Sequence, residues 1–304
     1  MAPPRSTRAS RSRPSQRRVA LRRALAAGFL ALFFGVALWL GTGAFGEAGE
    51  EEVAPPATTA PKPVPTLKIV FPEGFTRNEM IRRVGVVRNI AQRKRKITPK
   101  LSGATYAAAS RVAKLPAQFR GDAKGIEGFL FPATYEFTAK TTSKRLVADQ
   151  LTSFDRNWRK VNLREARSKN LTPYDVLIIA SMIEKETIAP EERAKVAAVI
   201  YNRLKAGMPL GIDATIRYGL DIPGTEALRV SQLESDNPYN TRNRVGLPPT
   251  PIANPGLASM RAAAKPADAD FLFFVRKPDK IHHFFTASES EFFAKACEYG
   301  FGCG

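Results

Sequence analysis

Residues 172–187 read TPYDVLIIASMIEKET and carry the clearest helix signal in the chain. Thr172 is a strong N-cap, Pro173 suits the first helical position, and Asp175 lies favourably in the first turn. The eight residues that follow, Val176–Ile183, include only one polar side chain. The sequence therefore predicts a helix that is buried on most of its sides.

Two carboxylates follow the buried part of this helix, in its last turn before Pro190. Glu184 lies on one face, whereas Glu186 continues the face of the apolar residues Ile179, Met182 and Ile183. An apolar setting at the negative end of a helix pushes a carboxyl group toward its protonated form, which a general acid needs at neutral pH. From these residues alone, solvated glutamates at a helix end are the simpler explanation.

Helices and strands are both expected elsewhere in the chain. A second helix is predicted from about Glu191 to Gly207, because apolar residues recur on one face and a glycine ends it. The alternating runs 67–71 and 271–275 read as strands, so we predict a mixed α+β body. Residues 126–137 are rich in aromatic side chains, which predicts either core packing or a platform for sugar rings.

The N-terminal part carries much of the net charge of +19. Residues 1–23 contain eight arginines and no acid, and residues 24–46 contain no charge. A run of this length matches the ~20 residues of a single transmembrane helix, and the arginines before it predict a cytoplasmic N-terminus with the remaining chain outside. A signal peptide cleaved near residues 44–46 is the alternative, and both interpretations export the folded part.

The rest of the chain divides into a linker and two folded parts. Residues 47–66 contain five prolines and few large apolar residues, which predicts an extended linker. Residues 67–120 are expected to form a small module, and residues 121–304 the main domain. Because the predicted transmembrane helix already explains the basic tail, no nucleic-acid partner is expected.

Cysteine and histidine are scarce. Two of each in the whole chain make a structural zinc site improbable. Export permits a disulfide between Cys297 and Cys303, and two free thiols on a C-terminal tail are the alternative.

Eight segments carry a resemblance to a known family. In chain order they read EGFLFP (127–132), IASMIEKET (179–187), ERAKVAAVIYNRL (192–204), GMPL (207–210), DATIRYG (213–219), NPYNT (237–241), GLPPTPIANPG (246–256) and HFFT (283–286). Together they resemble the YceG-like endolytic murein transglycosylases over roughly residues 67–290. Two positions depart from the family pattern: Ala214, where proline or serine is frequent, and Arg242, where an aromatic residue is common.

The resemblance implies a site. Glu186, the second acid of the EKE motif, would be the catalytic residue, Glu184 would order the site, and no metal or organic cofactor would be needed. Residues 67–120 would be a LysM-like module. Further substrate-binding residues would be Asn202, Asp213, Thr215, Tyr218, Tyr239, Asn240, Thr241, His283 and Phe285. Residues 239–241 equally suit an Asx-type turn, and His283 equally suits a packed, hydrogen-bonded histidine.

The resemblance also implies a reaction. The chain would be a lytic transglycosylase that cleaves the bond between N-acetylmuramic acid and N-acetylglucosamine in nascent peptidoglycan strands, leaves 1,6-anhydro ends and ends chain elongation. Hydrolysis of the same bond and a membrane-anchored, non-catalytic peptidoglycan-binding scaffold are the alternatives. We expect a single-pass protein of the cell membrane with its catalytic domain outside. Its partners would be glycan strands, the membrane and peptidoglycan synthases.

Overall fold

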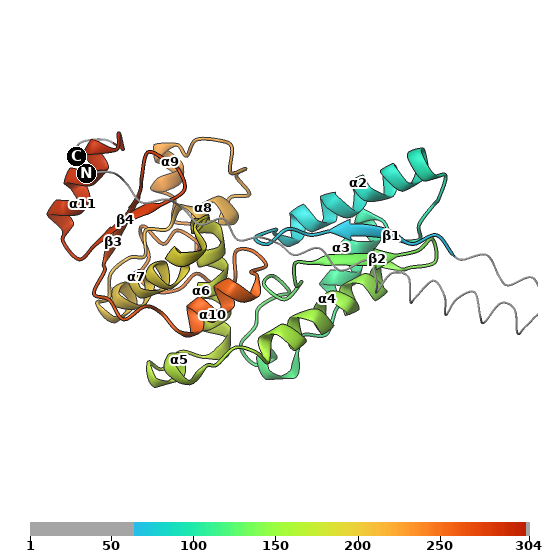
Figure 1. The fold of residues 1–304 in the computed structure, drawn as a ribbon, viewed down its shortest axis with the longest axis horizontal. Coiled ribbons are helices and arrows are strands. Elements are labelled where there is room, and N and C mark those ends of the chain that lie inside the picture. Colours follow the sequence, from blue (N-terminus) through green and yellow to red (C-terminus); the bar gives the residue numbers. More distant parts are fainter. Residues whose placement is uncertain (1–63, 302–304) are drawn as a thin grey trace, which may run out of the picture. The chain divides into compact units, whose positions relative to one another are not determined.

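The computed structural model describes residues 64–301. The predicted basic tail, the predicted transmembrane helix, most of the linker and Cys303 lie outside the described residues. Within residues 64–301, no helix combines the length and the apolar character needed to cross a bilayer. Cys297 is disulfide-bonded. The described part mixes helices with small sheets, which confirms the predicted α+β class (Figure 1).

A first hydrophobic core gathers around an antiparallel sheet of two strands, β1 (Leu67–Val70) and β2 (Thr134–Phe137). Three helices lie beside this sheet: α2 (Arg77–Arg95), α3 (Gly103–Arg111) and α4 (Ser143–Trp158) (Figure 1). Its buried residues are Ile69, Phe71, Met80, Val84, Leu101, Tyr106, Leu130, Tyr135, Phe137, Leu146 and Val147. This core therefore continues past residue 120, the expected end of the small module. The likeness of this part to a LysM module stays a prediction.

The long helix α2 is fixed at both ends by its own sequence. A capping box begins it, because the Thr76 hydroxyl accepts the Glu79 N–H at 3.2 Å and the Glu79 carboxylate accepts the Thr76 N–H at 2.7 Å. Lys96 ends it in the left-handed conformation, with φ of 55°. The helix buries Met80 and Val84 in the first core and exposes much of its other side to solvent.

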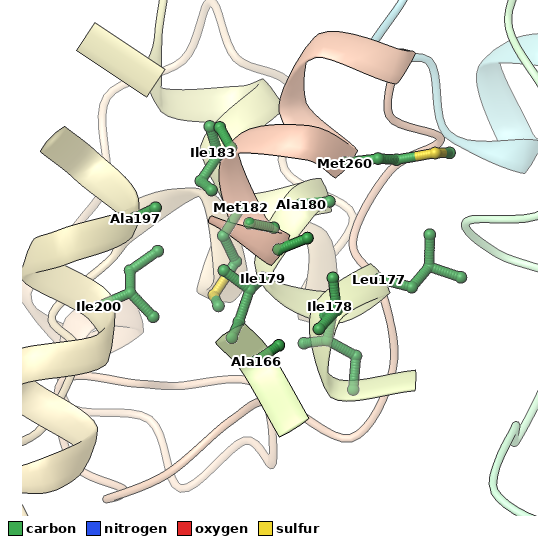
Figure 2. Close-up of a cluster of buried hydrophobic side chains, with 14 of the residues drawn as sticks. Ala166, Leu177, Ile178, Ile179, Ala180, Met182, Ile183, Ala197, Ile200 and Met260 are labelled. Carbon is green, nitrogen blue, oxygen red and sulfur yellow. The ribbon is translucent and has the colours of Figure 1, made fainter. Parts of the chain in front are cut away.

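A second hydrophobic core surrounds α6 (Pro173–Glu186). The predicted cap is present, because the Thr172 hydroxyl accepts the Asp175 N–H at 3.1 Å and the Asp175 carboxylate accepts the Thr172 N–H at 2.8 Å. Every residue from Val176 to Ile183 is buried, which confirms the predicted central helix. The helices α7 (Arg193–Lys205) and α10 (Leu257–Ala264) pack against it, and Figure 2 shows part of the shared cluster.

The remaining elements are short. They are η1 (Ala117–Phe119), α5 (Arg164–Ser168), η2 (Pro190–Glu192), α8 (Asp213–Gly219) and α9 (Val230–Leu233). The chain ends in an antiparallel hairpin of β3 (Phe273–Arg276) and β4 (His283–Thr286), followed by α11 (Glu289–Glu298). The hairpin pairs Arg276 with His283, and β3 corresponds to the strand predicted at 271–275.

The aromatic segment 126–137 contributes to both cores. Phe129 is fully buried in the second core, whereas Tyr135 and Phe137 are buried in the first. Gly128 directly precedes Phe129 at φ of 91°, and a β-carbon there would approach Pro251 to 2.8 Å, so only glycine fits. Of the two interpretations of this segment, burial of these rings supports core packing.

We predict that Phe129→Ala lowers the free energy of unfolding by about 3–5 kcal/mol. The Phe129 ring centroid lies 5.0 Å from that of Phe119 and 5.0 Å from that of Phe154, so truncation leaves a cavity in a packed aromatic cluster. Urea denaturation followed by circular dichroism measures the loss. Phe293→Ala is the matched control, because Phe293 is 50% exposed and its truncation should cost less than about 1 kcal/mol. Equal losses of unfolding free energy in the two variants would contradict the burial of Phe129 in the second core.

Candidate active site

Glu186 is the last residue of the buried helix α6. Thr187 ends the helix and donates both its N–H, at 3.0 Å, and its hydroxyl, at 2.7 Å, to the carbonyl of Ile183. These two hydrogen bonds to the last turn of α6 fix the backbone beside Glu186. The Glu186 side chain is therefore held at the rim of the second core and is only partly exposed.

Burial raises the pKa of Glu186 from its ordinary value of 4.5 to about 7. The guanidinium of Arg276 opposes this shift, as do the N–H of Ala214 and the ammonium of Lys185, whereas the negative charge of Asp213 adds to it. A carboxyl group with a pKa near neutrality can both give and take a proton at physiological pH.

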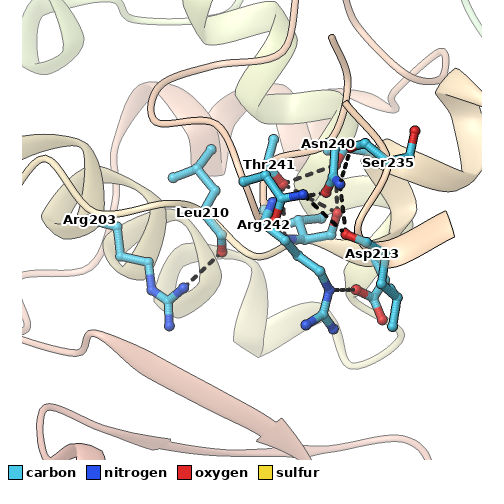
Figure 3. Close-up of polar contacts among 11 residues, drawn as sticks. Arg203, Leu210, Asp213, Ser235, Asn240, Thr241 and Arg242 are labelled. Atoms are coloured by element: carbon cyan, nitrogen blue, oxygen red, sulfur yellow. Dashed lines mark hydrogen bonds and ion pairs between the residues drawn. The ribbon is translucent and has the colours of Figure 1, made fainter. Parts of the chain in front are cut away.

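The helix α8 brings two of these groups to Glu186. Asp213 is its first residue, and the Ala214 N–H belongs to its first turn, where helices leave their N–H groups free for other acceptors. The Asp213 carboxylate also pairs with Arg242 at 2.7 Å (Figure 3), and both side chains are nearly half exposed. Arg242, the partner of Asp213, is one of the two departures noted in the sequence.

Thr215 and Thr241 fix the start of α8. Their hydroxyls lie 3.0 Å apart, and both side chains are buried. Thr215 donates to the Ile212 carbonyl at 2.6 Å, and Thr241 accepts the Ile212 N–H at 3.1 Å. The structure therefore shows these two predicted site residues holding the loop that carries Asp213.

The amide groups of two further predicted residues are bound to backbone. Asn240 donates to the carbonyls of Leu233, at 2.8 Å, and Ser235, at 2.7 Å (Figure 3). Asn202 donates to the carbonyls of Ala269 and Phe271, both at 2.9 Å. In this structure these amides fix loops, and their contact with substrate stays a prediction.

Tyr218 and Tyr239 form a second polar group near α8. Their rings meet edge to face at 5.1 Å, and the hydroxyl of Tyr239 lies 2.8 Å from that of Thr250. The Tyr239 N–H donates to the Asn237 side chain at 2.9 Å, so the Asx-type turn considered from the sequence is present. The Tyr218 hydroxyl donates to the carboxylate of Glu127 at 3.2 Å.

Glu127 is a buried carboxylate of the EGFLFP motif, and no role was predicted for it from the sequence. Burial raises its pKa to about 7, against the hydrogen bonds from the Arg77 N–H, the Tyr218 hydroxyl and the Asn254 amide. The Arg77 N–H lies 3.0 and 3.1 Å from its two oxygens, and the Asn254 amide lies 2.6 Å away. The signal in the sequence was one acid among glycine, isoleucine, phenylalanine and leucine.

Glu184 accepts the Gly256 N–H at 2.9 Å, at the N-cap of α10. A carboxylate is favoured at this end of a helix by the aligned peptide dipoles. Glu73 lies beside it, and burial and the charge of Glu184 raise the pKa of Glu73. Glu184 therefore links the end of α6 to the start of α10, and its expected role in ordering the site stays a prediction.

His283 is buried in the hairpin and binds an acid that sequence reasoning missed. Its Nδ1 lies 2.7 Å from Glu192, which also accepts the His283 N–H at 2.9 Å. The ring meets Phe274 at 5.4 Å and Phe285 at 6.1 Å, and Phe285 also lies under the ammonium of Lys195. This geometry is that of the packed, hydrogen-bonded histidine considered above.

The predicted residues thus fall into separate groups. Glu186 and Asp213 lie close together. Ala214 and Arg276 lie beside them, and these two had not been predicted as site residues. Arg276 could have been suspected, because it is a charge directly after the apolar run 271–275. Within residues 64–301, no group of three or more histidine, cysteine, aspartate or glutamate side chains is arranged to hold a metal ion.

Known proteins resemble this chain over most of the described residues. The profile of the YceG-like family matches residues 54–297. The endolytic murein transglycosylase of Bacillus subtilis is 38% identical over 50% of this chain and 42% of its own length. That of Streptococcus pneumoniae R6 is 30% identical over 74% of this chain and 43% of its own length. The chain thus spans less than half of the length of these curated relatives.

A solved structure agrees with the sequence match. The crystal structure of a YceG-like protein from Listeria monocytogenes superposes with a TM-score of 0.62 at 28% identity, over 74% of each chain. The family profile alone matches well over half of the chain, including every motif quoted above. This chain belongs to the YceG-like family.

Proposed function

We propose that this chain is an endolytic murein transglycosylase, a lyase that cleaves peptidoglycan strands between N-acetylmuramic acid and N-acetylglucosamine. The observation that carries the proposal is the carboxyl group of Glu186, whose pKa is raised to about 7 at the end of a buried helix. The names of the curated relatives, endolytic murein transglycosylases, support the same substrate.

The first proposed step needs the protonated form of Glu186. Its proton passes to the glycosidic oxygen, the bond to the muramyl C1 breaks, and N-acetylglucosamine leaves with a hydroxyl group. The oxocarbenium-like C1 is stabilised by the acetamido group of the substrate itself. Partial burial of Glu186 favours this step, because desolvation keeps its proton in place near neutral pH.

The second proposed step needs the carboxylate form. Glu186 takes the proton of the muramyl C6 hydroxyl, and the C6 oxygen bonds to C1 to close a 1,6-anhydro ring. Water is not consumed, and Glu186 ends protonated as it began. Arg276 and the Ala214 N–H favour the carboxylate between the two steps, because both lower the pKa of Glu186.

We further propose how the other predicted residues take part. Glu184 orders the site through α10, and Asp213 tunes the charge of Glu186. The remaining predicted residues would contact the glycan or hold the loops that do: Asn202, Thr215, Tyr218, Tyr239, Asn240, Thr241, His283 and Phe285. A transmembrane helix at residues 24–46 would keep the enzyme at the cell membrane. There it would lie beside newly made strands and their synthases, and its cleavage would end strand elongation.

Glu186→Gln should lower the rate of strand cleavage at least ~1,000-fold, because the amide can neither give nor take the proton. The full chain in detergent is incubated with peptide-linked glycan strands, and mass spectrometry reads the product ends. Internal fragments with anhydro ends are expected from the native chain only. Reducing ends would indicate a hydrolase, and unchanged glycan binding with no cleavage by either protein would indicate a scaffold.

The pH dependence should follow the charges around Glu186. The acid form is lost above pH 7, so kcat/KM should fall about tenfold per pH unit there. Arg276→Gln should move this fall to higher pH, because a group that lowers the pKa is removed, and Asp213→Asn should move it to lower pH. Arg261→Gln, at an exposed position on α10, is the matched control and should leave the profile unchanged. Shifts of the same sign in both site variants would refute the arrangement.

Stability should also depend on these carboxyl groups. Because the folded pKa of Glu186 lies above its ordinary value of 4.5, the folded state binds more protons between pH 4.5 and 7, and stability falls as pH rises through this window. Glu127 contributes in the same direction. Glu186→Gln should reduce this fall and raise the free energy of unfolding at pH 8 by on the order of 1–2 kcal/mol. Thermal unfolding of both proteins at pH 5 and pH 8 measures this change in stability. The same pH dependence in the variant and the native chain would contradict the raised pKa of Glu186.

A further inference from the structure

A long part of the chain contains no acid. Residues 80–121 include no aspartate or glutamate, and they include eleven basic residues: Arg82, Arg83, Arg88, Arg93, Lys94, Arg95, Lys96, Lys100, Arg111, Lys114 and Arg120. These residues belong to α2, α3 and the segments that follow them. The proposed reaction, whose groups lie around Glu186, makes no use of this charge.

Seven basic side chains gather at one end of the first core, and we call this set the basic end. The members are Arg93, Lys94, Arg95, Lys96, Lys100, Lys140 and Lys144. All seven are exposed, and none of them forms an ion pair with another residue of the described range 64–301. Their positive charge is therefore not neutralised within the folded part.

The backbone brings these residues together from two segments far apart in the chain. The Lys100 N–H donates to the Ala139 carbonyl at 3.0 Å, which places Lys140 beside it. The Ser102 N–H donates to the Ser143 hydroxyl at 3.4 Å, which brings Lys144 to the same end. In Figure 1 the end of α2 and the start of α4 lie at this end of the first core.

Apolar side chains continue this surface along α2. Val86 is 54% exposed and Ile90 is 49% exposed. Ile90 follows Val86 by four residues, and Arg93 and Lys94 follow Ile90 by three and four residues, so these side chains lie along one side of the helix. Helices that lie at a membrane surface combine exposed apolar side chains with Lys and Arg, and this part of α2 presents both.

We propose that the basic end, together with Val86 and Ile90, docks the folded part onto a bilayer that contains anionic phospholipids. The basic residues face the phosphate groups, and the two apolar side chains reach the boundary of the acyl chains. A soluble polyanion would satisfy the charge alone and would leave Val86 and Ile90 in water, so the bilayer fits the surface better. The inference goes beyond the proposed reaction and does not depend on it.

The path of the chain agrees with this partner. Leu67 begins β1 and pairs with Phe137, only a few residues before Lys140, so the chain comes into the first core at the basic end. The sequence predicts a linker at residues 47–66 after the transmembrane helix, and a Pro-rich linker of this length reaches at most ~60 Å. A bilayer that held the predicted helix would therefore lie within reach of the basic end.

Photo-cross-linking of the full chain tests the proposal. Ile90→benzoylphenylalanine is introduced, and the full chain is assembled into nanodiscs of phosphatidylcholine alone or with about 30% phosphatidylglycerol. Mass spectrometry measures lipid attached to residue 90. We expect at least about tenfold more attachment in the anionic discs at low salt, and loss of this difference at high salt.

Two fourfold variants separate the surface from overall charge. Arg93→Gln, Lys94→Gln, Lys96→Gln and Lys100→Gln together should abolish lipid attachment at residue 90. Lys160→Gln, Lys169→Gln, Lys205→Gln and Lys265→Gln together make the same change in net charge at exposed positions outside the basic end, and should leave attachment unchanged. Equal attachment in both disc types, equal loss in both variants, or no attachment at all would overturn the proposal.

Discussion

The carboxylate of Glu127 receives hydrogen bonds from three segments that are far apart in the chain. They come from the first N–H of α2, the amide of Asn254 in the loop before α10, and the hydroxyl of Tyr218 on α8. Asn254 also accepts the N–H groups of Gly128 and Leu130 and donates to the Phe75 carbonyl. Buried polar groups of this kind must all be satisfied together, because each unpaired one would cost about 1–3 kcal/mol. The first core, the second core and the helix that carries Asp213 are therefore joined in one arrangement.

This arrangement explains how an ordinary glutamate acquires a pKa near neutrality. Burial at the end of α6 raises the pKa of Glu186, and a fixed α8 keeps both Asp213 and the Ala214 N–H beside it. Burial and the opposing effects of Arg276, Ala214 and Asp213 together leave the carboxyl group about half-way between its two forms near neutral pH. In the proposed reaction the same group must act first as an acid and then as a base, so a balance of opposed charges suits it better than one dominant partner.

Caps and hydrophobic patterns predicted much of the secondary structure, but they did not predict which distant residues contact one another. The cap at Thr172 and the apolar run 176–183 were sufficient to predict α6, because caps and burial patterns depend on neighbouring residues. The pairing of β1 with β2 spans some 67 positions and left no local signal, so the extent of the first core was not foreseen. Glu186 was predicted through its motif, whereas Arg276, which approaches it from a distant strand, was not predicted. Glu192 was quoted within a motif, but its contact with His283 joins residues 91 positions apart.

The two departures from the family pattern noted in the sequence meet at one place. Ala214 supplies a backbone N–H that lowers the pKa of Glu186; a proline at this position would have no N–H to donate, whereas a serine would donate the same one. Arg242 pairs with Asp213 at 2.7 Å, which offsets a charge that raises the pKa of Glu186, and an aromatic residue there could not form this pair. The Ala214 N–H and the Arg242–Asp213 pair thus act on the same carboxyl group and in the same direction, toward the ionised form. The electrostatics at Glu186 therefore depend on residues that surround it and lie outside the EKE motif.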